Sequence, residues 1–88
     1  MLEKEVMRLN VNEAVRLRIF DLCDKRSLTV NKLSIMSGMT QSTVQNITSG
    51  RNKTTSISTI KKLCDGLDIT IQDFFDSDLF RDLEQEIK

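Results

Sequence analysis

The chain has 88 residues, 39% of them apolar and 30% charged, which fits one small soluble domain with a single core. It has no histidine and no run of about eighteen apolar residues, which excludes a membrane-spanning helix and any histidine-based catalytic site. Thirteen basic residues balance thirteen acidic ones, and this zero net charge, taken alone, argues against a nucleic-acid partner.

The charges are nevertheless segregated along the chain. Residues 25–64 contain seven basic residues and no acid, whereas residues 65–88 have a net charge of −6 and residues 1–24 a net charge of −1. Attraction to phosphates depends on the local surface, within a Debye length of about 8–10 Å, rather than on the total charge. The middle segment therefore favours a nucleic-acid-binding surface over the alternative of charges that are merely solvated.

Cys23 and Cys64 lie far apart and have no histidine to join them in a metal site. Because structural zinc needs about four ligands, we expect no metal. Both thiols are expected to be small buried groups in a cytoplasmic protein, and a disulfide between them is the less favoured alternative. The N-terminal sequence MLEKEVMRLN has acids among its apolar residues, unlike a secretory signal.

Residues 1–11 are expected to form an N-terminal extension, which the sequence leaves open as an extra helical turn, an arm or a strand that pairs with a partner. Asn12 is a suitable N-cap for a helix over residues 13–25. Its buried stripe is expected to consist of Val15, Ile19, Leu22 and Cys23. Arg16 and Arg18 are expected to lie outside this stripe.

Residues 29–50 predict two short helices joined by a tight turn at Gly38. Thr29 can cap the first helix and Thr40 the second, and Met39 is placed to pack inward after the turn. The apolar positions expected to face the core are Val30, Leu33, Ile35 and Met36 in the first helix and Val44 and Ile47 in the second.

The rest of the second helix is polar and uncharged. These side chains are amides and hydroxyls, which can hydrogen-bond to base edges in a DNA groove. They are Gln41, Ser42, Thr43, Gln45 and Asn46. The pattern predicts a DNA-binding helix-turn-helix whose recognition helix covers about residues 40–48.

A polar loop, RNKTTSIS, follows Gly50 and leads into a helix that Ser56 can cap. Backbone N–H groups at a helix N-terminus suit a phosphate, which we favour over an ordinary surface loop. The apolar face of this helix is expected to be Ile57, Ile60, Leu63, Cys64 and Leu67.

Thr70 and Asp73 form a capping box for the next helix, and Phe74 is expected to fill the core rather than to stack on a base. Leu79, Phe80, Leu83 and Ile87 then predict a final, acidic amphipathic helix over residues 77–88. Its apolar stripe is expected either to fold back on the domain or to meet its copy in a dimer.

From about Val11 to Phe75 the chain resembles the lambda-repressor/Cro-like (Xre-type) helix-turn-helix family of phage repressors and bacterial regulators. The resemblance rests on the runs SGMTQSTVQNITSG, SISTIKKLCDGL and ITIQDFF. It implies an all-α, five-helix fold and places the polar residues 41–46 in the major groove. The residues that it places at phosphate contacts are Thr29, Arg51, Asn52 and Lys53. Lys32 is expected to contact phosphate as well, because of its charge. Two positions depart from the family pattern. Val30 stands where the family often has Gln, and Asp68 stands where it often has Gly.

We therefore expect a sequence-specific regulator of transcription, a repressor, that binds double-stranded DNA as a homodimer. Residues 12–76 would form the DNA-binding domain. No enzyme activity and no cofactor are expected, because the chain has no Gly-rich phosphate loop and no visible nucleophile–base pair. The alternative is a protein-interaction module or an antitoxin-type protein that keeps the fold and binds a protein partner through the acidic C-terminal helix.

Overall fold

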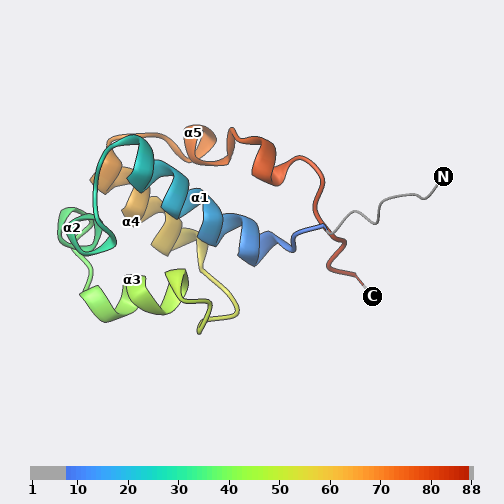
Figure 1. Ribbon diagram of the computed structural model, residues 1–88, viewed down its shortest axis with the longest axis horizontal. Helices are drawn as coiled ribbons and strands as arrows, with labels where there is room; N and C mark the ends of the chain where they lie inside the picture. The colour runs from blue at the N-terminus through green and yellow to red at the C-terminus, as the bar shows by residue number, and fades with distance from the viewer. Residues whose placement is uncertain (1–7, 88) are drawn as a thin grey trace.

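Five α-helices follow one another in the computed structural model, which describes residues 8–87 (Figure 1). They are α1 (Val11–Lys25), α2 (Val30–Met36), α3 (Gln41–Thr48), α4 (Ile57–Leu67) and α5 (Ile71–Phe75), and a 3₁₀ turn, η1 (Asp78–Phe80), comes after them. No strand occurs between residues 8 and 87, so the predicted all-α, five-helix fold is confirmed. The expectations for residues 1–7 lie outside the described part of the chain.

Each α-helix is preceded by an N-cap residue whose side chain accepts a hydrogen bond from the backbone N–H three residues later. The predicted caps Thr29, Thr40, Ser56 and Thr70 are confirmed. The expected cap at Asn12 is wrong, because Asn10 Oδ1 accepts from Glu13 N at 2.9 Å and Glu13 Oε1 accepts from Asn10 N at 3.1 Å. This capping box satisfies two N–H groups at once and starts α1 two residues earlier.

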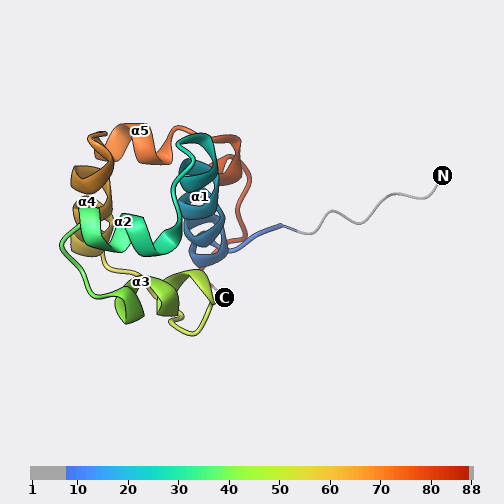
Figure 2. The ribbon, with the colours of Figure 1, turned by 60° about the vertical axis from the view of Figure 1, so that its left-hand side comes forward.

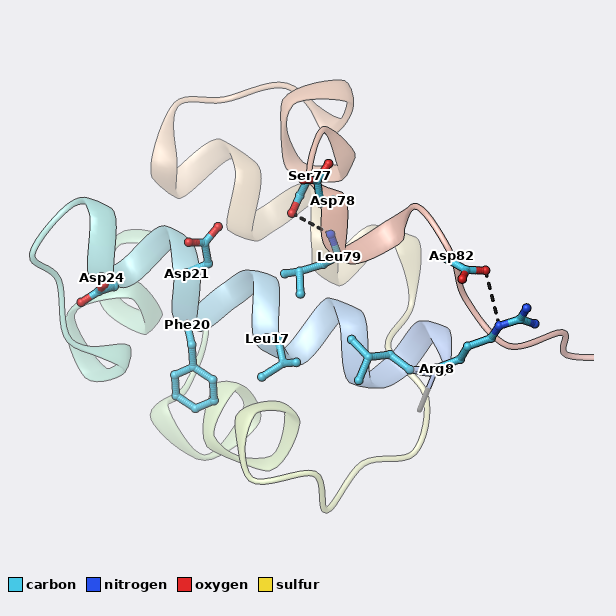
Figure 3. A pocket seen from close by; sticks show the side chains of 10 residues that line it. Arg8, Leu17, Phe20, Asp21, Asp24, Ser77, Asp78, Leu79 and Asp82 are labelled. Carbon is cyan, nitrogen blue, oxygen red and sulfur yellow. Dashed lines mark hydrogen bonds and ion pairs between the residues drawn. The ribbon is translucent and has the colours of Figure 1, made fainter. Parts of the chain in front are cut away.

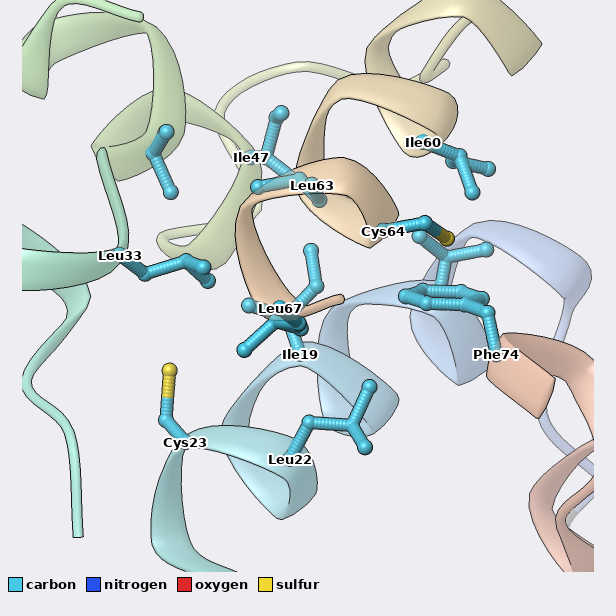
Figure 4. Packing of buried hydrophobic residues seen from close by; sticks show 12 residues of the cluster. Ile19, Leu22, Cys23, Leu33, Ile47, Ile60, Leu63, Cys64, Leu67 and Phe74 are labelled. Carbon is cyan, nitrogen blue, oxygen red and sulfur yellow. The ribbon is translucent and has the colours of Figure 1, made fainter. Parts of the chain in front are cut away.

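The core lies where α1, α2, α3 and α4 converge, with Phe74 of α5 closing one side (Figure 4). Figures 1 and 2 place α3 and α5 on opposite sides of the α1–α4 pair. The fully buried side chains of the core include Ile19, Leu33, Val44, Leu63, Leu67 and Phe74. α3 is thus held by its apolar face at one edge of the molecule, while its other face stays outside.

Three apolar residues that were expected to be buried are exposed. Ile35 is 66% exposed, Met36 40% and Ile57 59%. α2 has only seven residues, and it turns Leu33 and Ser34 rather than its last two residues toward the core. Ser34 is tolerated there because its hydroxyl donates to the carbonyl oxygen of Val30 at 3.0 Å.

Arg18 was expected to lie at the surface, but only 6% of it is exposed. Its Nε donates to the carbonyl oxygen of Phe74 at 2.7 Å and its Nη2 to that of Asp73 at 2.9 Å. Nη1 pairs with Asp21 Oδ2 at 2.6 Å. The guanidinium thus satisfies the carbonyl oxygen of Phe74, shares that of Asp73 with the backbone N–H of Asp76, and joins α5 to α1.

Both cysteines are free and buried in the core. Burial raises the pKa of the Cys23 thiol and of the Cys64 thiol. Both groups therefore stay protonated and pack as small apolar side chains.

Two conformations support the tight connections. Gly38 has φ +67° in the turn between α2 and α3, and Asp68 has φ +59° after α4. Asp tolerates this left-handed geometry better than most residues, so its departure from the family pattern is compatible with the fold. Gly66 permits α4 to approach α2, because a Cβ there would lie 2.4 Å from Ser37 Oγ and 3.1 Å from the backbone of Met36.

The predicted final amphipathic helix over residues 77–88 is wrong. Only the 3₁₀ turn η1 forms, and the chain then runs without regular structure to residue 87. So short and acidic a segment is a poor isolated helix, and here Glu84 donates its backbone N–H to the carbonyl oxygen of Leu9 at 2.9 Å instead. Of its apolar residues Phe80 folds back on the domain, whereas Ile87 is 87% exposed, and the alternative of a dimer contact stays a prediction. The ring of Phe80 lies 4.8 Å from that of Phe75 between centroids.

Candidate nucleic-acid interface

α2 and α3 form a helix-turn-helix with a hydrogen-bonded turn. Met39 donates its backbone N–H to the carbonyl oxygen of Ser34 at 3.0 Å, and its side chain packs against the core as predicted. On α3, Val44, Ile47 and Thr48 are buried. Thr48 is accommodated because its hydroxyl donates to the carbonyl oxygen of Val44 at 3.2 Å. The orientation of α3 is therefore set by its inner face.

The outer face of α3 is polar, uncharged and accessible. Gln41, Ser42, Thr43 and Gln45 are exposed and Asn46 is half-buried. Within the described residues the side-chain amides of Gln41, Gln45 and Asn46 make no hydrogen bond to the protein. Amides without a protein partner keep both a donor and an acceptor for a ligand, which is what bidentate contact with a base requires.

The hydroxyl groups on this face are partly engaged. Thr43 Oγ1 lies 2.8 Å from Thr40 Oγ1, which also accepts the backbone N–H of Thr43 at 3.3 Å. Ser49, which the sequence prediction missed, is exposed directly after α3 and shares the side of Ser42 and Gln45 by helical spacing. Its spacing of seven residues from Ser42 is the signal that could have identified it.

The basic residues of segment 25–64 differ in whether an acid already pairs with them. Lys25 Nζ lies 3.5 Å from Asp21 Oδ2, and Lys61 pairs with Asp65, whose hydrogen bond and charge raise the pKa of Lys61. Arg26 Nη1 donates to the carbonyl oxygen of Leu67 at 2.6 Å. In the part of the chain that the structure describes, no acid pairs with the remaining cations, Lys32, Arg51, Lys53 and Lys62. Lys32, Arg51 and Lys53 are exposed on α2 and on the loop after α3.

Backbone hydrogen bonds tie this loop to α3. Asn52 donates its N–H to the carbonyl oxygen of Asn46 at 3.0 Å, and Arg51 donates its N–H to Ser49 Oγ at 3.3 Å. Thr29, at the start of α2, is exposed and accepts the backbone N–H of Lys32 at 3.0 Å, which leaves its own O–H to donate. The predicted phosphate-contacting residues therefore lie at the start of α2, on α2 and in the loop that leaves α3.

Comparison with known proteins identifies the family. A family model of the Cro/C1-type HTH DNA-binding domain matches residues 18–78, which is most of the chain. The chain belongs to the Cro/C1-type helix-turn-helix family. The Cro/C1-type domain is also similar to a crystal structure of prophage Lp1 protein 11, with 33% sequence identity and a TM-score of 0.73. That similarity covers 85% of this chain and 99% of the other. No curated protein sequence matches the chain.

Membership of the Cro/C1-type family supports a DNA-binding regulator of the phage or bacterial type. The fold is that of non-enzymatic regulators. None of the helices among residues 8–87 is both long enough and apolar enough to cross a membrane.

Proposed function

We propose that the protein binds double-stranded DNA in a sequence-specific manner by inserting α3 into the major groove, and that it represses transcription from the bound site. The observation that carries this proposal is the outer face of α3, which is accessible, uncharged and rich in amides without a protein partner. Beside it lie cations that form no ion pair with an acid among the described residues. The base-contacting residues are Gln41, Ser42, Thr43, Gln45 and Asn46.

Gln45 is the principal base-reading residue of this proposal. It is exposed, about 100° around the helix from the buried Val44. Ser42 and Asn46 lie opposite the buried stripe, and Gln45 has the longer amide side chain on its flank. A Gln amide can pair bidentately with adenine in the major groove, which discriminates against a wrong base by about 1–3 kcal/mol. Gln41 lies one turn earlier on the same helix.

The phosphates on either side of the groove would be held by Thr29, Lys32, Arg51, Asn52 and Lys53. The amide and hydroxyl groups of this set can position the backbone, and its cations supply attraction that does not depend on sequence. One such domain contacts few base pairs. We therefore infer a homodimer on a pseudo-palindromic site whose half-sites are about 34 Å apart. Repression by occlusion of the polymerase is part of the proposal, and the small size of the domain and its likeness to a prophage protein support it.

Neutralising the loop cations tests the proposal. The variant Arg51→Ala/Lys53→Ala is expected to bind mixed-sequence duplex DNA about 10- to 100-fold more weakly near 0.1 M salt, because two phosphate contacts are lost. The slope of log affinity against log salt concentration should fall by about 1.8. Fluorescence anisotropy of a labelled duplex between about 50 and 200 mM salt measures both quantities.

The matched control removes the same charge elsewhere. In Lys25→Ala/Lys61→Ala the two lost cations are already paired with Asp21 and Asp65, so the salt slope should change much less. Equal slopes for the two double variants would contradict a specific role for the loop.

A second candidate function, binding of a protein partner, is favoured by a groove between α1 and the C-terminal segment (Figure 3). Leu17 and Phe20 line it from α1 and Leu79 from η1, and Phe20 is 41% exposed. The two functions are distinguished by DNA binding at low salt. Equally poor binding of random and selected sequences would favour the protein-interaction role.

A further inference from the structure

The acidic C-terminal segment is held along the start of α1. Besides the bond from Glu84 N–H to the carbonyl oxygen of Leu9, Arg8 Nε lies 3.5 Å from Asp82 Oδ1 (Figure 3). Figures 1 and 2 both show this segment running from η1 toward the side of the molecule on which α3 and its loop lie. Residues distant in the sequence are thereby brought next to the proposed phosphate-contacting loop.

Glu84 and Glu86 line the same hollow as Asn52 and Lys53. The hollow also contains Glu13 and Arg16 of α1, and Glu13 already accepts the backbone N–H of Asn10 in the capping box. Glu84 and Glu86 are exposed, and no cation among residues 8–87 pairs with them. Their charges therefore act on whatever approaches Lys53.

Two carboxylates at this position oppose the binding of a phosphate backbone. Within a Debye length of about 8–10 Å they lower the positive potential at Lys53, and a phosphate entering the hollow would meet two like charges. The attachment of the segment can be displaced. Arg8 and Asp82 are 53% and 68% exposed, and surface ion pairs of this kind are weak.

We propose that the C-terminal acidic segment is an autoinhibitory arm, in which the charges of Glu84 and Glu86 repel DNA phosphates from the Asn52–Lys53 loop. DNA binds more tightly when the arm is displaced or neutralised. This inference rests on the proposed DNA-binding function and adds a means of regulating the same site.

The test is the isosteric variant Glu84→Gln/Glu86→Gln, which keeps the backbone bond from residue 84 to Leu9. It is expected to bind a mixed-sequence duplex about three- to tenfold more tightly than the wild type at about 50 mM salt, and the gap should narrow as salt screens the charges. The control Asp24→Asn/Asp76→Asn makes the same change in net charge at exposed residues that do not line the hollow. It should have a smaller effect.

A double-mutant cycle tests whether Glu84 and Glu86 act through Lys53. In a Lys53→Ala background the gain from Glu84→Gln/Glu86→Gln should shrink, since neighbouring charges are coupled. The autoinhibitory arm alone would be overturned if Glu84→Gln/Glu86→Gln bound DNA with wild-type affinity or gained no more affinity than the control. An undiminished gain in the Lys53→Ala background would overturn it as well. Absence of DNA binding by every variant and by the wild type would overturn the DNA-binding function, and the arm with it.

Discussion

Replacing Phe74 with alanine is expected to lower the free energy of unfolding by about 3–5 kcal/mol, which is a large share of the stability of so small a domain. Phe74 is fully buried and is the largest of the completely buried side chains. Its ring lies 5.0 Å from that of Phe75 and 6.3 Å from that of Phe80 between centroids. Truncation therefore removes transfer free energy and leaves a cavity where α5 and the C-terminal segment meet the core.

Urea unfolding followed by circular dichroism measures this loss. The matched control is Ile57→Ala, a truncation on α4 of a side chain that is 59% exposed, which should cost less than about 0.5 kcal/mol. If both variants unfolded at the same urea concentration, Phe74 would not be part of the core. Because α5 lies across the molecule from α3, Phe74→Ala protein that remains folded should still bind DNA.

Arg18→Met is expected to cost about 3 kcal/mol of folding stability. Methionine can replace the aliphatic part of the side chain, but it leaves the carbonyl oxygen of Phe74 without its donor, whereas that of Asp73 keeps the backbone N–H of Asp76. Asp21 also loses its closest cation, although it is partly solvated and still has Lys25 3.5 Å away. Most of the expected loss therefore comes from the buried carbonyl group of Phe74.

Two further variants make this prediction specific. Arg16→Met changes the neighbouring arginine, which is half-buried and makes no hydrogen bond within the described residues, and should cost under about 0.5 kcal/mol. Arg18→Lys keeps the charge but lacks the planar fork, so most of the loss should remain. Thermal unfolding that ranked Arg16→Met with Arg18→Met would show that the bonds between α1 and α5 contribute little.

The sequence predicted best those features that depend on neighbouring residues. The caps at Thr29, Thr40, Ser56 and Thr70 follow from side chains that bond within three residues. The buried face of α4 follows from its period, except for Ile57 in its first turn. Helical periodicity also separated the inner from the outer face of α3, which is why its polar residues were identified.

The capping box of Asn10 and Glu13 was missed although it is local, but the other features discussed next depend on distant partners. Arginine is mostly exposed, and nothing near Arg18 in the sequence reveals carbonyl groups that lie 55 and 56 positions away. The apolar spacing of the last twelve residues fits a helix, but it does not reveal the competing bond from Glu84 to Leu9. Charge counting likewise located the basic segment, but it could not show which of its lysines are paired. Lys61 pairs with Asp65, whereas Lys53 has no acidic partner among the described residues.

Selection of bound duplexes from a random DNA pool, with light scattering on the same sample, tests most directly whether α3 reads DNA. We expect a dimer mass and a two-fold symmetric consensus with half-sites about 34 Å apart. Repeating the selection with Gln45→Ala should relax one position in each half-site while leaving affinity for random DNA nearly unchanged. Base reading by α3 would be contradicted if the pool showed no enrichment. It would also be contradicted if Gln45→Ala and Gln41→Ala selected the same consensus as the wild type.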